Sequence, residues 1–328
     1  MKLSSRQIIN KIKKSRLVGM GGAGFPTGLK WEIVKNAKAN QKYIICNASE
    51  GEPDVFKDGY LLENYPQEVI EGIKIALSVF ENSFAYIYLR KDYYQRFKNK
   101  LEKLIKGLPI VLFKETGGYL CGEETTLIES IEGQREEPRI RPPFPCRKGL
   151  FNCPTLINNA ETFYYVAKVI ENKYEQTRFY CLSGDLKKPG IYEMPLSFTI
   201  KKILEETGNF PEFDFFVQAG GGASGEILTS RELGRPVNGS GAIIVYNLKK
   251  TKPILLMKKW INFYFEQNCG KCVPCREGIY RIKELLDKNK IDKEILDDLL
   301  FILEETSFCA LGKNVTLPFK SLIEKIYK

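Results

Sequence analysis

The chain has 328 residues, of which 43% are hydrophobic and 27% are charged, and this composition excludes a disordered, collagenous or coiled-coil chain. Its length predicts about two domains, and its formal charge of +10 is spread along Lys-rich helix faces, so that we expect no nucleic-acid partner. The chain contains nine Cys and no His, which excludes catalysis by histidine and zinc sites with histidine ligands.

The first half of the chain predicts alternating helices and strands after an amphipathic N-terminal helix. A glycine-rich loop at 19–28 is followed by strands at 43–46, 84–89 and 109–113 and by helices at 66–80 and 92–106. Two further helices are predicted to open near Gly122 and Thr155, on either side of the Pro-rich segment 139–145. This alternation is typical of an α/β fold, which places ligands in the loops that follow its strands.

The second half predicts a small α+β module and then helices. Short β-like segments between residues 178 and 248 surround one predicted helix at 197–207, and the run GGGASG at 220–225 is predicted as a loop. Helices are predicted near 253–267, 276–288, 291–306 and 315–327. Four amphipathic helices in succession are typical of a small bundle.

We expect a cytoplasmic chain. No apolar run approaches the ~20 residues that a transmembrane helix needs. The N-terminal residues alternate charge with short apolar steps, unlike a secretory signal. An odd number of Cys without such a signal argues against a disulfide framework and favours a metal bound by thiolates.

The strongest chemical signal is Cys269-x-x-Cys272-x-x-Cys275. Three thiolates at three-residue steps can surround one cluster, because the backbone between them curls around it with its amides toward the sulfurs. Zinc ligands usually form separated pairs, so a 4Fe-4S cluster is favoured over the alternatives of zinc or free thiols. Arg276 stands directly after Cys275, so we expect a remote fourth ligand. Cys309 is the best candidate because it is the only other Cys among the predicted C-terminal helices.

The glycine-rich loop, GMGGAGFPTG, is the second signal. Closely spaced glycines let backbone amides approach a phosphate or a flat ring, and Lys30 could neutralise phosphate charge. The loop matches neither a P-loop nor a Rossmann fingerprint, and a purely structural turn is the alternative.

Two acidic stretches form the third signal, NASEGEP at 47–53 and GEET at 122–125. The first follows a predicted strand and the second opens a predicted helix. Carboxylates at such positions can accept hydrogen bonds from ribose hydroxyls or from the edge of a flavin. The alternative is a capping role, since the helix dipole favours Glu in a first turn.

A set of motifs in matching order covers nearly the whole chain: GMGGAGFPTGLKWE, CNASEGEPDVFKDGYLLE, GGYLCGEETTLIESIEGQREEPRIRPPFP, GLFNCPTLINNAETF, and CGKCVPCREG with a distant FCALG. They resemble the flavin-bearing, NADH-oxidising subunit of respiratory complex I and the related diaphorase subunits of NAD-linked hydrogenases and formate dehydrogenases. The resemblance implies an α/β domain at 1–175 that binds FMN and NADH. It further implies a small β-grasp (SLBB, ubiquitin-like) domain at 176–250 and a four-helix bundle with one 4Fe-4S cluster at 251–328.

The resemblance also implies site residues. FMN would be held by Gly21, Gly22, Gly24, Lys30, Asn47, Glu50, Tyr119, Gly122, Glu123, Asn158 and Asn159. NADH would be bound by Phe25, Phe144, Glu52, Glu124 and Arg141, with both Phe rings on the adenine, Glu52 at the adenosine ribose and Glu124 beside the nicotinamide. The cluster would be held by Cys269, Cys272, Cys275 and Cys309. Hydride would pass from NADH to FMN and single electrons to the cluster, without a catalytic acid or base.

Four residues depart from the family's usual pattern. Met20 stands in place of Arg, Ile33 in place of Phe, Arg141 in place of Lys, and Ser49 in place of Asp. Ser49 replaces an anionic contact to FMN by a neutral one, and we expect this to change the binding or the potential of the flavin.

By the same resemblance, the partners would be a small thioredoxin-like 2Fe-2S subunit and an electron-accepting subunit rich in Fe-S clusters. We expect no transmembrane segment and a place on the cytoplasmic side of a membrane complex. One alternative is a diaphorase subunit of an NAD-linked or electron-bifurcating hydrogenase or of a formate dehydrogenase. Another is a non-catalytic electron-relay or docking subunit without FMN.

Overall fold

The computed structural model describes residues 3–288 and 291–327. The chain divides into two compact units. The first unit contains Met1–Gly51 and Phe56–Phe179, and the second contains Glu52–Val55 and Tyr180–Lys328. Domain limits at residues 175 and 250 stay a prediction.

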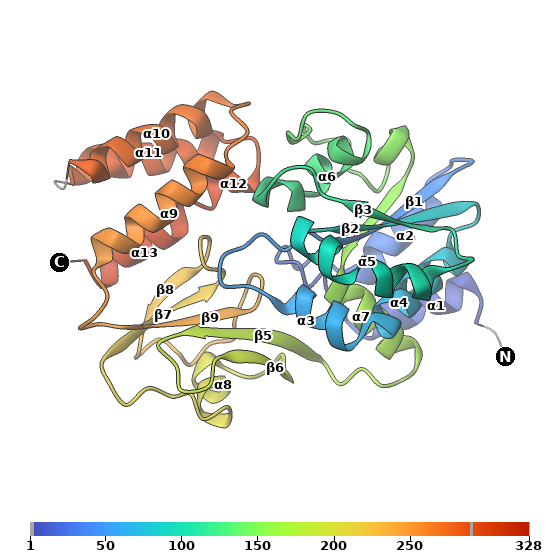
Figure 1. Cartoon of the computed structure of the whole chain (residues 1–328), viewed down its shortest axis with the longest axis horizontal. Coiled ribbons are helices and arrows are strands. Elements are labelled where there is room, and N and C mark those ends of the chain that lie inside the picture. The colour runs from blue at the N-terminus through green and yellow to red at the C-terminus, as the bar shows by residue number, and fades with distance from the viewer. Residues whose placement is uncertain (1–2, 289–290, 328) are drawn as a thin grey trace. The chain divides into compact units, whose positions relative to one another are not determined.

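The first unit is built on a four-stranded parallel sheet (Figure 1). Its strands are β1 (Lys42–Ala48), β2 (Ser83–Leu89), β3 (Ile110–Lys114) and β4 (Thr155–Asn159), in the order β3-β2-β1-β4. The central strands are nearly continuous apolar runs, as expected where helices cover both faces of a sheet. The predicted α/β fold is confirmed.

Helices cover both faces of this sheet. They are α1 (Ser5–Lys14), α2 (Thr27–Asn36), α3 (Lys57–Asn64), α4 (Pro66–Val79), α5 (Lys91–Ile105), α6 (Glu124–Ile131) and α7 (Ala160–Ile170), with short 3-10 helices η1 (Tyr119–Gly122) and η2 (Leu150–Asn152). α4 and α7 pack closely together and contact the sheet. Leu127 and Ile128 of α6 form a buried cluster with Ile45, Tyr88 and Ile157 of the strands.

The helix predicted near Thr155 is wrong, because Thr155–Asn159 is strand β4. Parallel pairing with β1 buries most of this short segment, and local periodicity cannot distinguish a short buried strand from a helix. α7 begins only at Ala160, where the Asn159 side chain accepts a hydrogen bond from the Glu161 amide. Helices α2 and α3 were not predicted, since both are short and weakly amphipathic.

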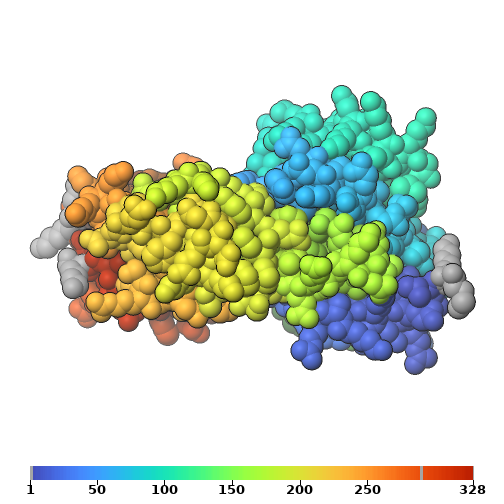
Figure 2. All heavy atoms as spheres, turned by 90° about the horizontal axis from the view of Figure 1, so that it is seen from below, coloured from blue at the N-terminus to red at the C-terminus, as the bar shows by residue number. Residues whose placement is uncertain are grey.

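The second unit contains a mixed sheet of five strands in the order β6-β5-β9-β7-β8. The strands are β5 (Thr177–Gly184), β6 (Gly190–Pro195), β7 (Phe215–Gly220), β8 (Glu226–Thr229) and β9 (Ala242–Asn247). β5 runs parallel to β9, and β7 runs antiparallel to both β8 and β9. Helix α8 (Ile200–Glu206) buries Ile200, Ile203 and Leu204 in a core with strand residues. Its Lys and Glu side chains are exposed, and this stretch of the chain belongs to the yellow part of the surface in Figure 2.

The C-terminal part of the second unit is helical, as predicted. Its helices are α9 (Pro253–Gln267), α10 (Val273–Asp287), α11 (Lys293–Thr306), the short α12 (Ala310–Lys313) and α13 (Thr316–Lys325). α10 packs against α9 and α11, and α11 packs against α13. Trp260, Leu300 and Phe319 are fully buried among them. Over residues 3–288 and 291–327, the helices are too short or too polar to cross a membrane.

Candidate functional site

The carboxyl ends of β1 and β4 bring together three residues predicted to bind FMN. In the parallel register Asn47 lies opposite Asn159, and Cys46 lies opposite Asn158. β2 and β3 lie on one side of β1 and β4 lies on the other, so the strand order reverses between β1 and β4. Parallel sheets bind ligands beyond the carboxyl ends of their strands at such a reversal. The topology therefore supports a ligand site at this edge.

The glycine-rich loop lies against Asn159. Gly22 and Gly24 have φ angles of 115° and 64°, a region that glycine adopts without the strain of other residues. A Cβ atom on Gly21 would come within 3.2 Å of the Asn159 Cβ, whereas one on Gly24 would meet nothing within 4 Å. The loop is exposed to solvent. Its bare backbone therefore fits the close approach of a phosphate or a flavin ring.

Glu124 lies between two cations. Its Oε1 atom is 2.9 Å from Nη1 of Arg141, and its Oε2 atom is 3.5 Å from Nζ of Lys30. The Lys30 ammonium also donates to the Ile157 carbonyl over 3.1 Å, which fixes it at the β4 strand. The structure therefore joins a lysine predicted for FMN with two residues predicted for NADH.

The 3-10 helix η1 packs against the end of β1. Nδ2 of Asn47 donates to the Gly122 carbonyl over 2.9 Å. A Cβ atom would come within 2.9 Å of the Ser49 carbonyl if placed on Gly122, and within 2.8 Å of the Tyr119 Cα if placed on Gly51. Side chains at either glycine would push η1 away, so glycine at these two positions allows η1 to pack against the end of β1.

Glu123 caps helix α6. Its Oε2 atom accepts from the amides of Thr125 and Thr126, each over 2.9 Å. The capping alternative is therefore confirmed for this residue. Its other oxygen, Oε1, lies 3.7 Å from Nη2 of Arg141. A role in FMN binding stays a prediction.

The two aromatic rings predicted for adenine are both exposed. The exposed fraction of Phe25 is 42% and that of Phe144 is 54%. The Arg141 guanidinium lies 5.8 Å from the centre of the Phe144 ring, within the range of a cation–π contact. An exposed aromatic ring offers a flat apolar surface to a planar ligand.

Arg139 holds the loop that carries Arg141 and Phe144, a role that the sequence analysis missed. Its guanidinium lies 2.5 Å from Glu129 and 2.7 Å from Glu132, both on or next to α6. Its amide donates to the Thr125 hydroxyl over 2.9 Å. Together these contacts fix the start of the loop against α6. Glu129 and Glu132 stand ten and seven positions before Arg139 in the chain, a spacing that gives no local sequence signal of the contact.

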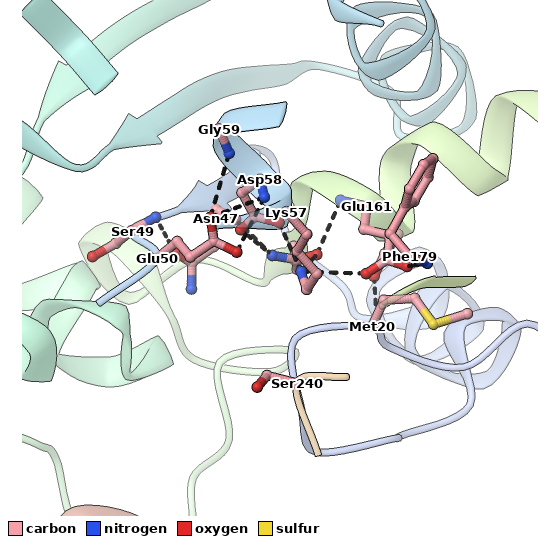
Figure 3. Close-up of polar contacts among 12 residues, drawn as sticks. Met20, Asn47, Ser49, Glu50, Lys57, Asp58, Gly59, Glu161, Phe179 and Ser240 are labelled. Carbon is pink, nitrogen blue, oxygen red and sulfur yellow. Dashed lines mark hydrogen bonds and ion pairs between the residues drawn. The ribbon is translucent and has the colours of Figure 1, made fainter. Parts of the chain in front are cut away.

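Lys57, Asp58 and Glu161, labelled in Figure 3, form a buried ion cluster that no sequence motif indicated. Nζ of Lys57 lies 2.7 Å from Asp58 Oδ1 and 3.2 Å from Glu161 Oε2, and these side chains are 2%, 3% and 0% exposed. Oδ2 of Asp58 accepts from Nδ2 of Asn159 over 2.6 Å. Removing one charge would leave another buried without its partner, which is costly. The cluster thereby holds Asn159 in one orientation.

Glu50 is buried and binds the start of α3. Its carboxylate accepts from the amides of Asp58 and Gly59, over 2.9 and 3.3 Å, and from the Tyr93 hydroxyl over 2.8 Å. Burial, followed by the nearby Asp58 carboxylate, raises the pKa of Glu50 to about 7. Its contact with FMN stays a prediction, while its role in anchoring α3 is visible in the structure.

Glu52 belongs to the second unit, where the loop GGGASG binds it. Its Oε1 atom accepts from the amides of Ala223 and Ser224, each over 3.0 Å, and from the Ser224 hydroxyl over 2.8 Å. A Cβ atom on Gly221 would lie 2.3 Å from the same oxygen, so glycine is needed there. The loop thus has a role in holding Glu52, and the proposed ribose contact stays a prediction.

The four predicted cluster ligands lie near one another at the ends of two helices. Cys272 precedes α10, Cys275 lies in its first turn, and Cys309 precedes α12. Burial, together with the nearby sulfurs of Cys272, Cys309 and Cys269, raises the pKa of Cys275. A Cβ atom on Gly312 of α12 would come within 3.3 Å of the Cys275 Cβ. α12 therefore brings Cys309 to the Cys269–Cys275 segment.

The chemistry around these cysteines fits an iron–sulfur cluster. The Ser307 hydroxyl is buried without a hydrogen-bond partner among the described residues, and it lies against Gly312. A buried hydroxyl is costly unless it finds an acceptor, and cluster sulfurs are acceptors. Within the described residues, no three His, Cys, Asp or Glu side chains are arranged to hold a single metal ion. A cluster differs in this respect, because each thiolate binds a different iron.

The two parts of the chain match two family models. Residues 12–168 match the Nuo51 FMN-binding domain, and residues 255–328 match the NADH-ubiquinone oxidoreductase-F iron-sulfur binding region. The chain is 32% identical to the second F-type subunit of NADH-quinone oxidoreductase from Rhizobium meliloti (strain 1021), over 97% of this chain and 86% of that protein. The chain belongs to the family of F-type subunits of NADH-quinone oxidoreductase. The resemblance inferred from the motifs is confirmed, as are FMN and a 4Fe-4S cluster as cofactors.

Hydrogenase subunits are similar to this chain as well. The NAD-reducing hydrogenase HoxS subunit alpha of Cupriavidus necator is 34% identical, over 98% of this chain and 60% of that protein. A crystal structure of an NAD+-reducing [NiFe]-hydrogenase in the H2-reduced state superposes with a TM-score of 0.91 at 30% identity, covering 98% of this chain and 61% of that one. The chain thus spans about three fifths of these hydrogenase chains.

Replacing Glu50 tests its protonation. Because its pKa is about 7 instead of the usual 4.5, the folded chain keeps a proton that the unfolded chain releases between these values. The free energy of unfolding must then fall as the pH rises through this window, by up to about 1.4 kcal/mol per pH unit. We expect the melting temperature of wild type to fall, relative to Glu50→Gln, between pH 5 and pH 7.

Thermal unfolding followed by circular dichroism measures this difference. Glu81→Gln, at a side chain that is 93% exposed, is the matched control and should keep the wild-type pH profile. Identical profiles for wild type and Glu50→Gln would contradict the assignment.

Proposed function

We propose that the chain is the NADH-oxidising flavoprotein subunit of a larger electron-transfer complex of the complex I type. When bound, FMN and the 4Fe-4S cluster supply the redox chemistry, in which the electron pair of the NADH hydride is passed on as single electrons. The protein's task is to bind and orient, which agrees with a chain without His. The observation that carries the proposal is the glycine-rich loop lying against Asn159 at the β1–β4 strand reversal.

The FMN site would be formed in the first unit. Gly21, Gly22 and Gly24 would expose backbone amides to the flavin, and Lys30 would neutralise phosphate charge. Asn47 and Asn159 would offer amide groups from the two strand ends, with Asn159 held by the Lys57–Asp58 pair. The remaining residues of the proposed set are Glu50, Tyr119, Gly122, Glu123 and Asn158.

The NADH site would use the exposed side chains that adjoin it. Phe25 and Phe144 would stack on adenine. Arg141, now paired with Glu124 over 2.9 Å, would turn toward the pyrophosphate, since a guanidinium binds phosphate oxygens through paired N–H groups. Glu124 would then be free to contact the nicotinamide. Support for this comes from the shared position of Lys30, Glu124 and Arg141.

We further propose that the second unit holds a β-grasp (SLBB) domain and a four-helix bundle. A mixed sheet of five strands packed against helix α8 supports the first. The packing of α9, α10, α11 and α13 supports the second. Cys269, Cys272, Cys275 and Cys309 would bind the cluster.

A diaphorase subunit of an NAD-linked hydrogenase is the second candidate, favoured by 34% identity to the hydrogenase subunit of Cupriavidus necator. In either complex we propose a 2Fe-2S subunit and an Fe-S-rich electron acceptor as partners. The nine cysteines form no disulfide bond with one another, which supports a reducing, cytoplasmic compartment. Identification of the subunits that co-purify with the tagged chain distinguishes the two complexes.

Substitution of Gly22 tests the flavin site. Gly22 has a φ of 115°, which Val cannot adopt without strain. A side chain there would also occupy the space beside the exposed backbone of the loop. We expect Gly22→Val, purified anaerobically, to lose flavin absorbance and NADH oxidation but to keep its iron. Gly234→Ala, where a Cβ atom would meet nothing within 4 Å, should keep both. Stoichiometric FMN in Gly22→Val would contradict this role for the loop.

Substitution of Cys309 tests the cluster ligands. We expect Cys309→Ala to lose most of its iron and its cluster absorbance while FMN remains bound, because three thiolates leave one iron without a protein ligand. Iron analysis and visible spectra measure this loss. Cys153→Ala changes a free Cys of the first unit and should keep the cluster. An unchanged iron content in Cys309→Ala would show that the fourth ligand lies elsewhere.

Glu52 is predicted to select NADH over NADPH. Its Oε1 atom is bound by the GGGASG loop, and a carboxylate at the ribose would repel the 2′-phosphate of NADPH. We expect a preference of about 30- to 1,000-fold in kcat/KM, corresponding to about 2–4 kcal/mol. Glu52→Gln should reduce this preference, as measured by steady-state rates with both nucleotides. Equal use of both nucleotides by wild type would contradict the assignment.

A further inference from the structure

Ser49 is joined to a buried carboxylate. Its Oγ atom lies 2.5 Å from Oε2 of Glu115. Glu115 follows the end of β3 and is 6% exposed. The other carboxylate oxygen of Glu115, Oε1, accepts from the Lys91 amide over 3.2 Å. The two residues are 66 positions apart in the chain, so sequence patterns gave no sign of this pair.

The groups around Glu115 act on its pKa in opposite directions, and the net effect is a rise above the ordinary value of a Glu carboxyl. Burial raises its pKa, and Asp92 acts in the same direction. The Ser49 hydroxyl, the Lys91 amide and the Arg90 guanidinium act against this rise. An amide can only donate, and the Ser49 hydroxyl donates to the second oxygen, so both oxygens are placed as the acceptors of a carboxylate.

This pairing decides what Ser49 can offer to a ligand. A serine hydroxyl has one proton and two lone pairs. With its proton directed to Glu115, the Ser49 oxygen is left as an acceptor, and the adjacent charge polarises it further. Toward a ligand, Ser49 therefore resembles one oxygen of a carboxylate. The hydroxyl that contacts the ligand is neutral, and the negative charge of Glu115 lies directly behind it.

Ser49 lies among residues of the proposed FMN site. Its amide donates to Oδ1 of Asn47 over 3.1 Å. Its carbonyl oxygen would lie 2.9 Å from a Cβ atom on Gly122. The Ser49–Glu115 pair therefore stands at the carboxyl end of the sheet, where β1 and η1 meet.

We propose that Ser49 and Glu115 act as one anionic unit that sets the potential of the flavin, with Glu115 acting as a positioning residue through Ser49. The proposal rests on the proposed function, because it requires FMN at this edge of the sheet. A fixed negative charge disfavours the added electron density of reduced flavin relative to oxidised flavin. Removing the charge should therefore raise the midpoint potential of FMN.

Two variants test the pair. In Glu115→Gln, reduced FMN should bind three- to tenfold more tightly relative to oxidised FMN, which corresponds to a rise of about 15–30 mV for a two-electron couple. The double variant Ser49→Asp/Glu115→Gln returns one carboxylate to the pair and should restore the wild-type potential. Anaerobic redox titration of the flavin absorbance measures both. Glu102→Gln, at a half-exposed side chain on α5, is the matched control with an unchanged potential.

Each outcome has one meaning. Wild type without FMN would contradict the proposed function itself. If wild type and Glu115→Gln both bind FMN with the same potential, only the role of the pair is wrong. If Glu115→Gln does not retain FMN, the double variant decides: recovered FMN with the wild-type potential supports the anionic unit, and continued loss overturns it.

Discussion

Parallel pairing of β1 with β4 is the constraint on which the proposed flavin site depends. It sets Asn47 opposite Asn159 and separates β4 from β2 and β3. Two further elements of the site contact these strand ends. The glycine-rich loop lies against Asn159, and η1 lies against the residues that follow β1. If β4 shifted by one residue against β1, the side chains of β4 would turn to the opposite face of the sheet.

Buried charges make this edge rigid. Lys57 lies within ion-pair distance of two carboxylates, and Asp58 in turn holds the Asn159 amide. Such charges are costly to bury, and they remain stable only when their partners are well placed. The cluster therefore favours a single orientation of Asn159 before any ligand arrives. A preformed site of this kind loses less entropy when it binds its ligand.

Several carboxylates that are proposed to contact ligands also accept hydrogen bonds from backbone amides. Glu123 uses one oxygen to cap α6, and Glu52 uses one oxygen to bind the GGGASG loop. A carboxylate has about four lone-pair positions, so accepting from backbone amides does not by itself exhaust the acceptor positions of either residue. Glu50 differs, because its carboxylate already accepts several donors around α3. For Glu123 and Glu52, the contacts with backbone amides fix the position of the carboxylate.

The sequence by itself determined the chemistry that depends on local spacing. Three-residue steps bring the thiolates of Cys269, Cys272 and Cys275 close together. The glycines of the loop carry no side chains, so their backbone is accessible to a ligand. Hydrophobic periodicity also located most helices. Tertiary structure alone decided that Thr155–Asn159 is a strand, because only pairing with β1 distinguishes it from a helix. It alone showed Lys57 beside Glu161 and Ser49 bound to Glu115. These contacts join residues that are distant in the chain, and local sequence patterns carry no information about such distances.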